Sequence, residues 1–160
     1  IGYNITIHWV WELHCVMAHF AEIDDNNNVV IVLCVDNKLI GEGQGGESEA
    51  AGIAHLRTIN GADKNYIQTS YNTLRDEHLD GGTAFRWNYA EPGSVWDPEN
   101  GGFIPIKPFA SWVWNDTTKD WEPTTGYPPE GTGIVASWNE DEGRWDKWDE
   151  ASETWSPYTW

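Results

Sequence analysis

Trp residues recur in this chain in pairs seven positions apart, and they are its clearest candidates for a binding role. WNDTTKDW, WNEDEGRW and WDEASETW each begin and end with Trp, with Asn or Asp second and an acidic residue third. WDPENGGF is a looser version that ends in Phe. An exposed Trp ring can stack on a sugar or anchor a protein contact, because it offers a large apolar area. The pairs are Trp96 with Phe103, Trp114 with Trp121, Trp138 with Trp145 and Trp148 with Trp155.

Two interpretations of these Trp units are open. In the first, each unit is a β-hairpin whose end aromatics face each other, with Asn115 opposite Asp120 and a tip of two or four residues. In the second, the Trp rings form exposed platforms for a glycan. We favour packing and interface contact, because Trp at both ends suits stapling better than a one-sided platform. The candidate interface or glycan-binding residues are Trp112, Trp114, Trp121, Trp138, Trp145, Trp148 and Trp155.

Carboxylates within the units raise the question of catalysis. Glu140, Asp141, Asp149 and Glu150 could supply the two carboxyl groups, about 5–10 Å apart, that a glycosidase needs. One of them would need a raised pKa, and we expect these groups to be solvated at hairpin tips without a fixed partner. No motif for a catalytic nucleophile or a phosphate-binding loop occurs. We therefore expect no catalytic residues and no enzyme activity.

Metal sites are also not expected. His14, Cys15, His19 and Cys34 match no standard spacing of zinc ligands. The polar run 24–28 lacks the spacing and the Gly of an EF-hand loop, and polar residues are common at hairpin tips. We expect neither a metal nor a cofactor.

Charge restricts the class of partner. The chain has 160 residues, only 9 Lys and Arg, and a net charge of −17. Binding of nucleic acid requires Lys and Arg to neutralise phosphates, and an anionic membrane surface repels acidic proteins. No apolar run approaches the roughly 18 residues that span a bilayer. We expect no nucleic-acid partner and no membrane partner.

The first half of the chain predicts a small antiparallel sheet. A strand over 18–23 precedes turn-forming residues at 24–28, and the apolar run 29–35 returns as a second strand. That run does not alternate, which predicts a central strand with Val30, Ile31, Val32 and Leu33 buried. A third strand is expected over 66–72, and an irregular loop over 74–85.

One helix is expected, over 47–60. Glu47 and Glu49 suit its N-terminal end, and apolar residues recur on one face. Asn60-Gly61 predicts its end, because Gly can adopt positive φ.

Domain organisation follows from a change in composition. Ten of the twelve Trp residues lie at or beyond residue 87. The sequence predicts a sheet-plus-helix domain over 17–85 and a Trp-rich β-hairpin extension over 86–160. The fold class is mainly β (α+β). Met17 and the residues after it are typical of a start, so we interpret residues 1–16 as an extraneous N-terminal extension. The alternative is an ordinary N-terminal strand, because YNITIHWVW is rich in residues that favour strands.

The order of several segments resembles a known family. MAHFAEID from Met17, IQTSYN from Ile67, KPFASW from Lys107 and the W-N-E…W unit at Trp138 follow the pattern of small, largely uncharacterised proteins encoded by marine tailed phages, especially cyanophages. The resemblance implies a virion structural or tail-associated component located in the virion, whose partners are other virion proteins or copies of itself. It implies no catalytic residues. The alternative function is a glycan- or receptor-binding module of a tail or fibre, with a host surface glycan as partner.

Overall fold

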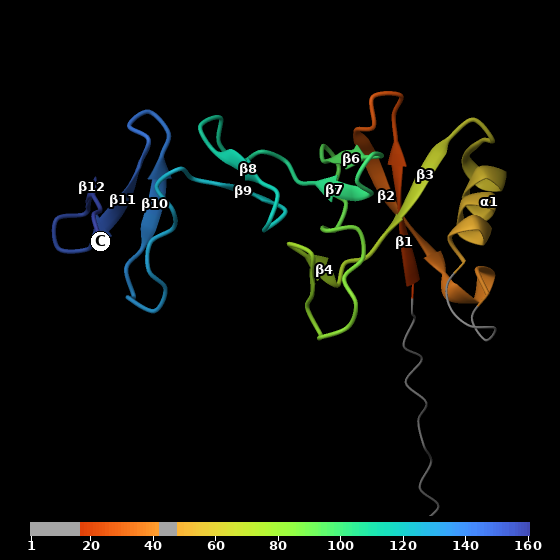
Figure 1. The fold of residues 1–160 in the computed structure, drawn as a ribbon, viewed down its shortest axis with the longest axis horizontal. Coiled ribbons are helices and arrows are strands. Elements are labelled where there is room, and N and C mark those ends of the chain that lie inside the picture. Colours follow the sequence, from red (N-terminus) through yellow and green to blue (C-terminus); the bar gives the residue numbers. More distant parts are fainter. Residues whose placement is uncertain (1–16, 42–47) are drawn as a thin grey trace, which may run out of the picture.

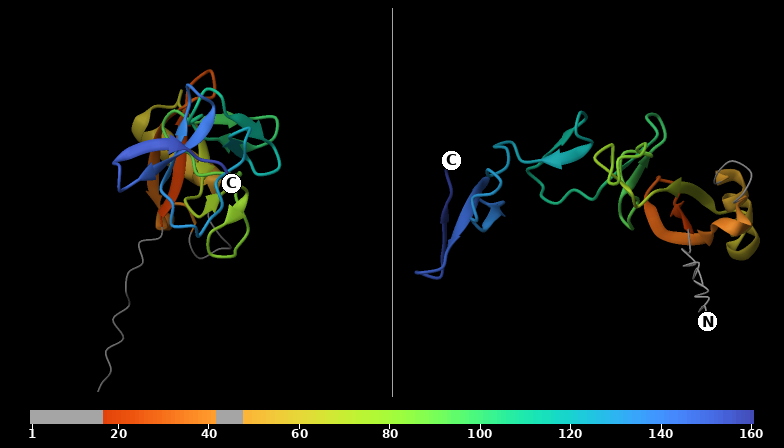
Figure 2. Two further views of the ribbon diagram at one scale, coloured as in Figure 1. Left: turned by 90° about the vertical axis from the view of Figure 1, so that its left-hand side faces the viewer. Right: turned by 90° about the horizontal axis from the view of Figure 1, so that it is seen from below.

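The computed structural model describes residues 17–41 and 48–160 as an elongated row of small antiparallel sheets with one α-helix (Figure 1). The predicted mainly-β class is confirmed. Residues 1–16 and 42–47 lie outside the described residues, and with them the prediction that 1–16 are extraneous. The right-hand view of Figure 2 shows the sheet-and-helix end and the C-terminal sheet at opposite ends of the row, and the left-hand view looks along it.

The N-terminal sheet has three antiparallel strands, β1 (Met17–Ile23), β2 (Val29–Asp36) and β3 (Asn65–Thr69), in the order β2-β1-β3. The prediction that the apolar run is a central, buried strand was wrong, because β3 pairs with β1 and leaves β2 at the edge. Val29 and Val35 are 3% exposed, whereas Val30 and Ile31 are 53% and 44% exposed. An apolar run predicts a strand, but the choice of its neighbours is made by distant segments.

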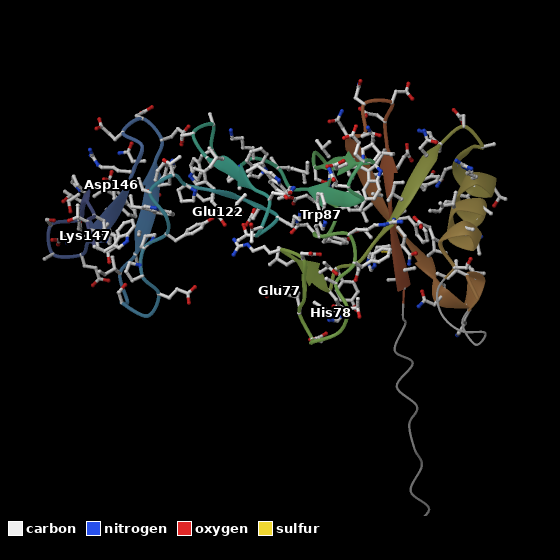
Figure 3. The ribbon with its side chains drawn as sticks, in the orientation of Figure 1. Glu77, His78, Trp87, Glu122, Asp146 and Lys147 are labelled. Carbon is white, nitrogen blue, oxygen red and sulfur yellow. The ribbon has the colours of Figure 1, made fainter. Side chains whose placement is uncertain are left out.

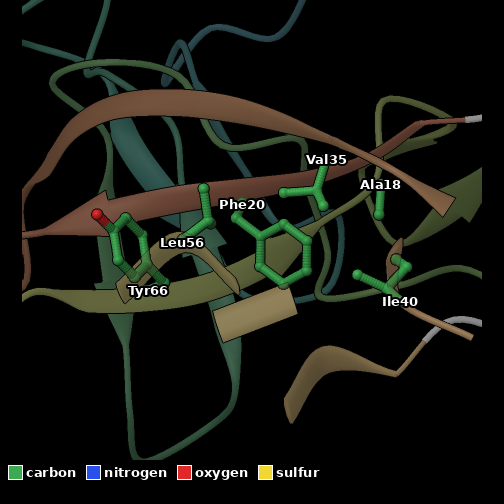
Figure 4. Close-up of a cluster of buried hydrophobic side chains, with 6 residues drawn as sticks. All are labelled: Ala18, Phe20, Val35, Ile40, Leu56 and Tyr66. Atoms are coloured by element: carbon green, nitrogen blue, oxygen red, sulfur yellow. The ribbon is translucent and has the colours of Figure 1, made fainter. Parts of the chain in front are cut away.

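The first face of this sheet is covered by α1 (Glu49–Asn60) and by the short 3-10 helix η1 (Asn37–Leu39). Phe20 is completely buried at its centre. Gly52 of α1 permits this contact, because a Cβ there would lie only 2.1 Å from the end of the Phe20 ring. Figure 4 shows the cluster, which consists of Ala18, Phe20, Val35, Ile40, Leu56 and Tyr66.

The ends of α1 follow from local chemistry. The Ser48 hydroxyl accepts a hydrogen bond from the Ala51 N–H at 3.3 Å, which caps the N-terminus. Gly61 has φ 116 and ends the helix, as the Asn-Gly pair predicted. The described helix begins at Glu49, two residues later than predicted, because Ser48 takes the cap position.

The second face of the sheet is covered by the first Trp unit. Its strands are β6 (Val95–Asp97) and β7 (Gly102–Ile104), and Phe103 is completely buried beside Ala21, Val29 and Ala90. The Arg86 guanidinium donates two hydrogen bonds of 2.8 Å to the Glu49 carboxylate of α1. Segments on both sides of residue 86 therefore pack together, and the division of the chain at that residue stays a prediction.

The segment predicted as an irregular loop contains a further hairpin, β4 (Thr73–Leu74) and β5 (Glu77–His78). Arg75 and Asp76 connect these strands with φ values of 54 and 60, the backbone of a type I′ turn. Strands of two residues have no periodicity to detect, so the sequence did not reveal them. The predicted third strand also ends earlier, at Thr69.

The remaining strands form two more sheets. β8 (Val113–Asn115) and β9 (Asp120–Glu122) form a hairpin. β10 (Ala136–Asn139), β11 (Arg144–Asp149) and β12 (Thr154–Pro157) form a three-stranded antiparallel sheet in that order. This C-terminal sheet carries the last two Trp units, which share β11.

Candidate functional site

All four predicted aromatic pairs face each other across hairpins. Each pair occupies directly opposite positions of neighbouring strands. Their rings are tilted or edge to face, as aromatic pairs prefer. The distances between ring centres are 4.9 Å for Trp96 and Phe103, 5.5 Å for Trp114 and Trp121, 5.5 Å for Trp138 and Trp145, and 5.4 Å for Trp148 and Trp155.

The second residue of each unit builds the turn. Asp149 Oδ1 accepts hydrogen bonds from the N–H groups of Ala151 and Ser152 at 2.9 and 3.0 Å. The same capping bonds to tip N–H groups are made by Asp97, Asn115 and Asn139. The tip has four residues, since the flanking strands end at Asn115 and Asp120 in the second unit. The repeated Asn or Asp is therefore a turn-forming residue.

The sixth residue of each unit completes this turn. Its φ is positive in all four units, with values of 77 at Gly101, 54 at Lys119, 59 at Gly143 and 54 at Glu153. Gly in two of these positions is a sequence signal that could have predicted the four-residue tip. Lys119 and Glu153 adopt the same conformation at a steric cost.

Two of the four carboxylates expected to be solvated without a fixed partner, Glu140 and Asp149, have hydrogen-bond partners, although all four residues are exposed. Glu140 accepts hydrogen bonds from the Ser111 hydroxyl and N–H at 2.6 and 2.8 Å, and from Trp138 Nε1 at 2.8 Å. These bonds, from Ser111 first and then Trp138, hold the pKa of Glu140 below its ordinary value. Backbone N–H groups of Ser152 and Ala151 lower the pKa of Asp149 in the same way.

Lowered pKa values suit acceptors of hydrogen bonds. In the described part of the chain, every carboxyl group whose pKa is shifted has it shifted downward. A general acid in glycoside hydrolysis needs a raised pKa instead, so that it still holds a proton near neutral pH. These carboxylates are therefore suited to accept hydrogen bonds.

Two of the candidate Trp residues, Trp112 and Trp138, are turned inward. Trp112 packs against Trp138 and Trp145 with ring centres 6.2 and 6.4 Å away, and it is 8% exposed. Trp138 is 6% exposed. With Phe109 and Tyr127, these residues form what we call the aromatic cluster. Little of the surface of Trp112 and Trp138 is left for a partner.

The Trp114–Trp121 pair lies at the junction with the N-terminal part of the chain. The Trp121 indole donates to the Pro105 carbonyl at 2.8 Å, and Trp114 lies 6.4 Å from Trp87. The Lys119 ammonium lies 4.2 Å from the centre of the Trp87 ring, which is a cation–π contact. Figure 3 labels Trp87 between the β8–β9 hairpin and the N-terminal sheet. Both Trp residues of this pair are half-buried.

The last pair lies on the opposite face of the C-terminal sheet from the aromatic cluster. Trp145 and Trp148 are three positions apart on β11, so their side chains leave opposite faces. Trp155 is 46% exposed. An open pocket of about 390 Å³, which we call the Trp155 pocket, is lined by Ser137, Trp138, Asn139, Glu140, Asp146 and Trp155.

A second pocket at this end is more aromatic. It has a volume of about 340 Å³, and we call it the Trp160 groove. Trp160 is 52% exposed, and its ring centre lies 5.3 Å from that of Tyr158. Sequence reasoning missed both residues, because they follow the last Trp unit and belong to none of the aromatic pairs seven positions apart. The groove is lined by Thr125, Arg144, Trp145, Tyr158, Thr159 and Trp160.

Other kinds of site are not evident in residues 17–41 and 48–160. No group of three or more His, Cys, Asp or Glu side chains there is placed to hold a metal ion. No helix of these residues is long and apolar enough to cross a membrane. A pocket of about 400 Å³ beside His19 and Tyr71 contains no Trp. Comparison of the chain with family models, curated proteins and solved structures found no match.

Proposed function

We propose that this chain is a non-enzymatic structural component of a tailed-phage virion, associated with the tail, a fibre or the capsid. It assembles with other virion proteins or with copies of itself through its Trp-rich hairpin region. The resemblance of its ordered segments to marine tailed-phage proteins supports this proposal. The net charge of −17 supports contacts with proteins rather than with the packaged nucleic acid.

The single observation that carries the assembly role is the Trp160 groove. Three aromatic residues and an Arg line it, and these residue types are enriched where protein interfaces are strongest. The Trp160 ring is half exposed although it has a large apolar area. Covering it with a neighbouring protein would remove that area from water, at about 25 cal/mol per Å² of apolar surface.

The position of the groove suits a protein that connects two neighbours. The C-terminal sheet and α1 lie at opposite ends of the elongated chain (Figure 1). A protein of this shape can contact one neighbour at each end. The paired Trp residues along the row stabilise the separate hairpins, whereas Trp160 belongs to no cross-strand pair and its exposed ring is available for contact.

The test compares particle incorporation of two single variants. Trp160→Ala removes the exposed ring from the groove, and Trp155→Ala removes a similarly exposed ring that does not line the groove. We expect purified particles to contain at least tenfold less of the Trp160→Ala chain and near wild-type amounts of the Trp155→Ala chain. Absence of the wild-type chain from particles would contradict the virion role. Equal incorporation of both variants would contradict the role of the groove.

Hydrogen exchange provides a second readout on the wild-type chain. In the isolated chain we expect stronger amide protection over 17–104 than over 130–160. In the particle, protection should rise at 154–160. Full protection of 138–155 in the isolated chain, with no further change in the particle, would contradict assembly through this region.

A further inference from the structure

We propose that the Trp155 pocket binds an uncharged sugar ring of a glycan. This site shares no lining residue with the Trp160 groove, and sugar binding is a function beyond virion assembly. Its ligand class follows from three features, which are a fixed aromatic platform, a frame of hydrogen-bonding groups and negative charge.

The platform is the ring of Trp155. The ring centres of Trp148 and Trp155 are 5.4 Å apart with their planes at 58°, and Trp148 does not line the pocket. Trp148 therefore holds Trp155 in position while leaving it 46% exposed. The face of an aromatic ring carries partial negative charge, which attracts the C–H groups on the apolar face of a pyranose. A ring that is already held loses little conformational entropy on binding.

The hydrogen-bonding frame is built by Asp146 and its neighbours on β10 and β11. Asp146 Oδ2 accepts from Asn139 Nδ2 at 2.7 Å, and Asp146 Oδ1 accepts from Arg144 Nε at 2.9 Å. Each carboxylate oxygen can accept a second hydrogen bond, and the Asn139 amide has a second N–H. Ser137 lies directly across the strands from Asp146. Sugar hydroxyls can donate and accept, so they match this set.

The composition of the pocket favours a sugar over a protein segment. Its lining has one exposed aromatic ring, and the rest consists of Ser, Asn, Glu and Asp beside the buried Trp138. Strong protein contacts have an apolar centre that is depleted of charge. A pyranose has one small apolar face with hydroxyls around its edge, which is the arrangement that this pocket complements.

The charge of the site selects an uncharged ligand. The carboxylates of Glu140, Glu142 and Asp146 contribute −3 and Arg144 contributes +1, which sums to −2 at and beside the pocket. Arg144 is already bound to Glu142 and Asp146, both at 2.9 Å. Hydrogen bonds from Asn139 and Arg144 lower the pKa of Asp146, so it remains ionised near neutral pH. Uronic acids and phosphorylated sugars are therefore repelled.

The experiment measures binding of purified full-length chain to defined saccharides by calorimetry. Mannan, galactan and N-acetylglucosamine oligomers represent neutral glycans, and alginate represents acidic ones. Free glucose and galactose distinguish a monosaccharide site from a polysaccharide site. We expect at least one neutral glycan to bind with a dissociation constant below about 1 mM, in the range of weak specific complexes. Alginate should bind at least tenfold more weakly. Failure of every neutral saccharide to bind, or equal binding of alginate, would overturn the proposal.

Three variants locate the site. Trp155→Ala should weaken neutral-glycan binding at least tenfold, and Asp146→Asn should weaken it by several-fold. Trp155→Phe keeps an aromatic ring opposite Trp148, and its affinity for neutral glycan should stay within about threefold of wild type. This variant distinguishes loss of the aromatic platform from loss of the hairpin. Trp160→Ala is the matched control and should bind glycan as wild type does. An equal loss in Trp160→Ala and Trp155→Ala would overturn the assignment to this pocket, whatever the outcome of the incorporation test.

Discussion

The N-terminal and C-terminal sheets are both three-stranded and antiparallel, but they are covered differently. In the N-terminal sheet, Phe20 on one face and Phe103 against the other are completely buried. In the C-terminal sheet, the aromatic cluster covers one face, and the other face carries Trp155, which is 46% exposed. The first sheet is the centre of a layered core, and the second has one face that is open to solvent at Trp155.

The difference shows how much an aromatic pair contributes to the stability of a sheet. A cross-strand pair contributes about 0.2–1 kcal/mol, whereas ordering a residue costs about 1–2 kcal/mol. The C-terminal sheet therefore also depends on its capped turns and on Trp112. The N-terminal sheet depends on α1 and on the β6–β7 hairpin, which come from distant parts of the sequence. We expect the two sheets to respond differently to substitution.

The largest effect is expected at the centre of the N-terminal core. Phe20→Ala should reduce the free energy of unfolding by about 3–5 kcal/mol, because it leaves a cavity between β1 and Gly52 of α1. Urea denaturation followed by far-UV circular dichroism measures this loss. Ile59→Ala is the control, since Ile59 is 65% exposed. This control should cost less than about 0.5 kcal/mol, as surface substitutions usually do.

A small effect of Phe20→Ala would contradict this account of the N-terminal core. A cost below about 1 kcal/mol for Phe20→Ala, close to that of an average substitution, would show that this face is not the main core.

Trp112→Ala should have the next largest effect, and a local one. Loss of the indole at the centre of the aromatic cluster should destabilise the C-terminal sheet by about 2–4 kcal/mol. Hydrogen exchange should show lost protection over 130–160 and little change over 17–104. Equal loss in both segments would mean that the two sheets unfold as one unit, which would remove the contrast between them.

A smaller effect is expected from a turn cap. Asn139→Ala removes the acceptor for the Glu142 N–H and the donor to Asp146 Oδ2, and it should cost about 1–2 kcal/mol. Thermal unfolding monitored by Trp fluorescence measures it. Glu150→Ala changes an exposed tip residue of the next unit and should stay within about 0.5 kcal/mol of wild type. If both substitutions cost the same, the Asn or Asp of the units is not a specific cap.

The smallest effect is a gain in stability at the last turn. Glu153 has φ 54, which is unfavourable for a residue with a Cβ. Glu153→Gly should therefore stabilise the β11–β12 hairpin by about 0.5 kcal/mol, after the greater entropy of Gly in the unfolded chain is subtracted. Gly143→Ala, at the same position of the preceding unit, should destabilise it by about 1 kcal/mol. Hydrogen exchange of the two hairpins distinguishes the effects, and a loss of stability in Glu153→Gly would contradict this account of the turn.

The parts of the fold that the sequence predicted are those with local causes. The β1 strand, the end of α1 at Gly61 and the four aromatic pairs each depend on residues within a few positions of one another. The prediction for β2 was wrong because the edge or centre of a sheet is decided by β3, which lies beyond α1 in the chain. The β4–β5 hairpin was missed because two-residue strands leave no pattern.

The candidate site divides in the same way. The pairing of Trp148 with Trp155 and of Trp138 with Trp145 could be predicted from the sequence, since the spacing, the Asn or Asp cap and the sixth residue all act within one hairpin. Three features required the folded chain, namely the packing of Trp112 on the Trp138–Trp145 pair, the bond from Ser111 to Glu140, and the exposure of Trp155 above Asp146. A hairpin specifies which residues face each other, whereas the covering of each face depends on packing between segments that are distant in the chain.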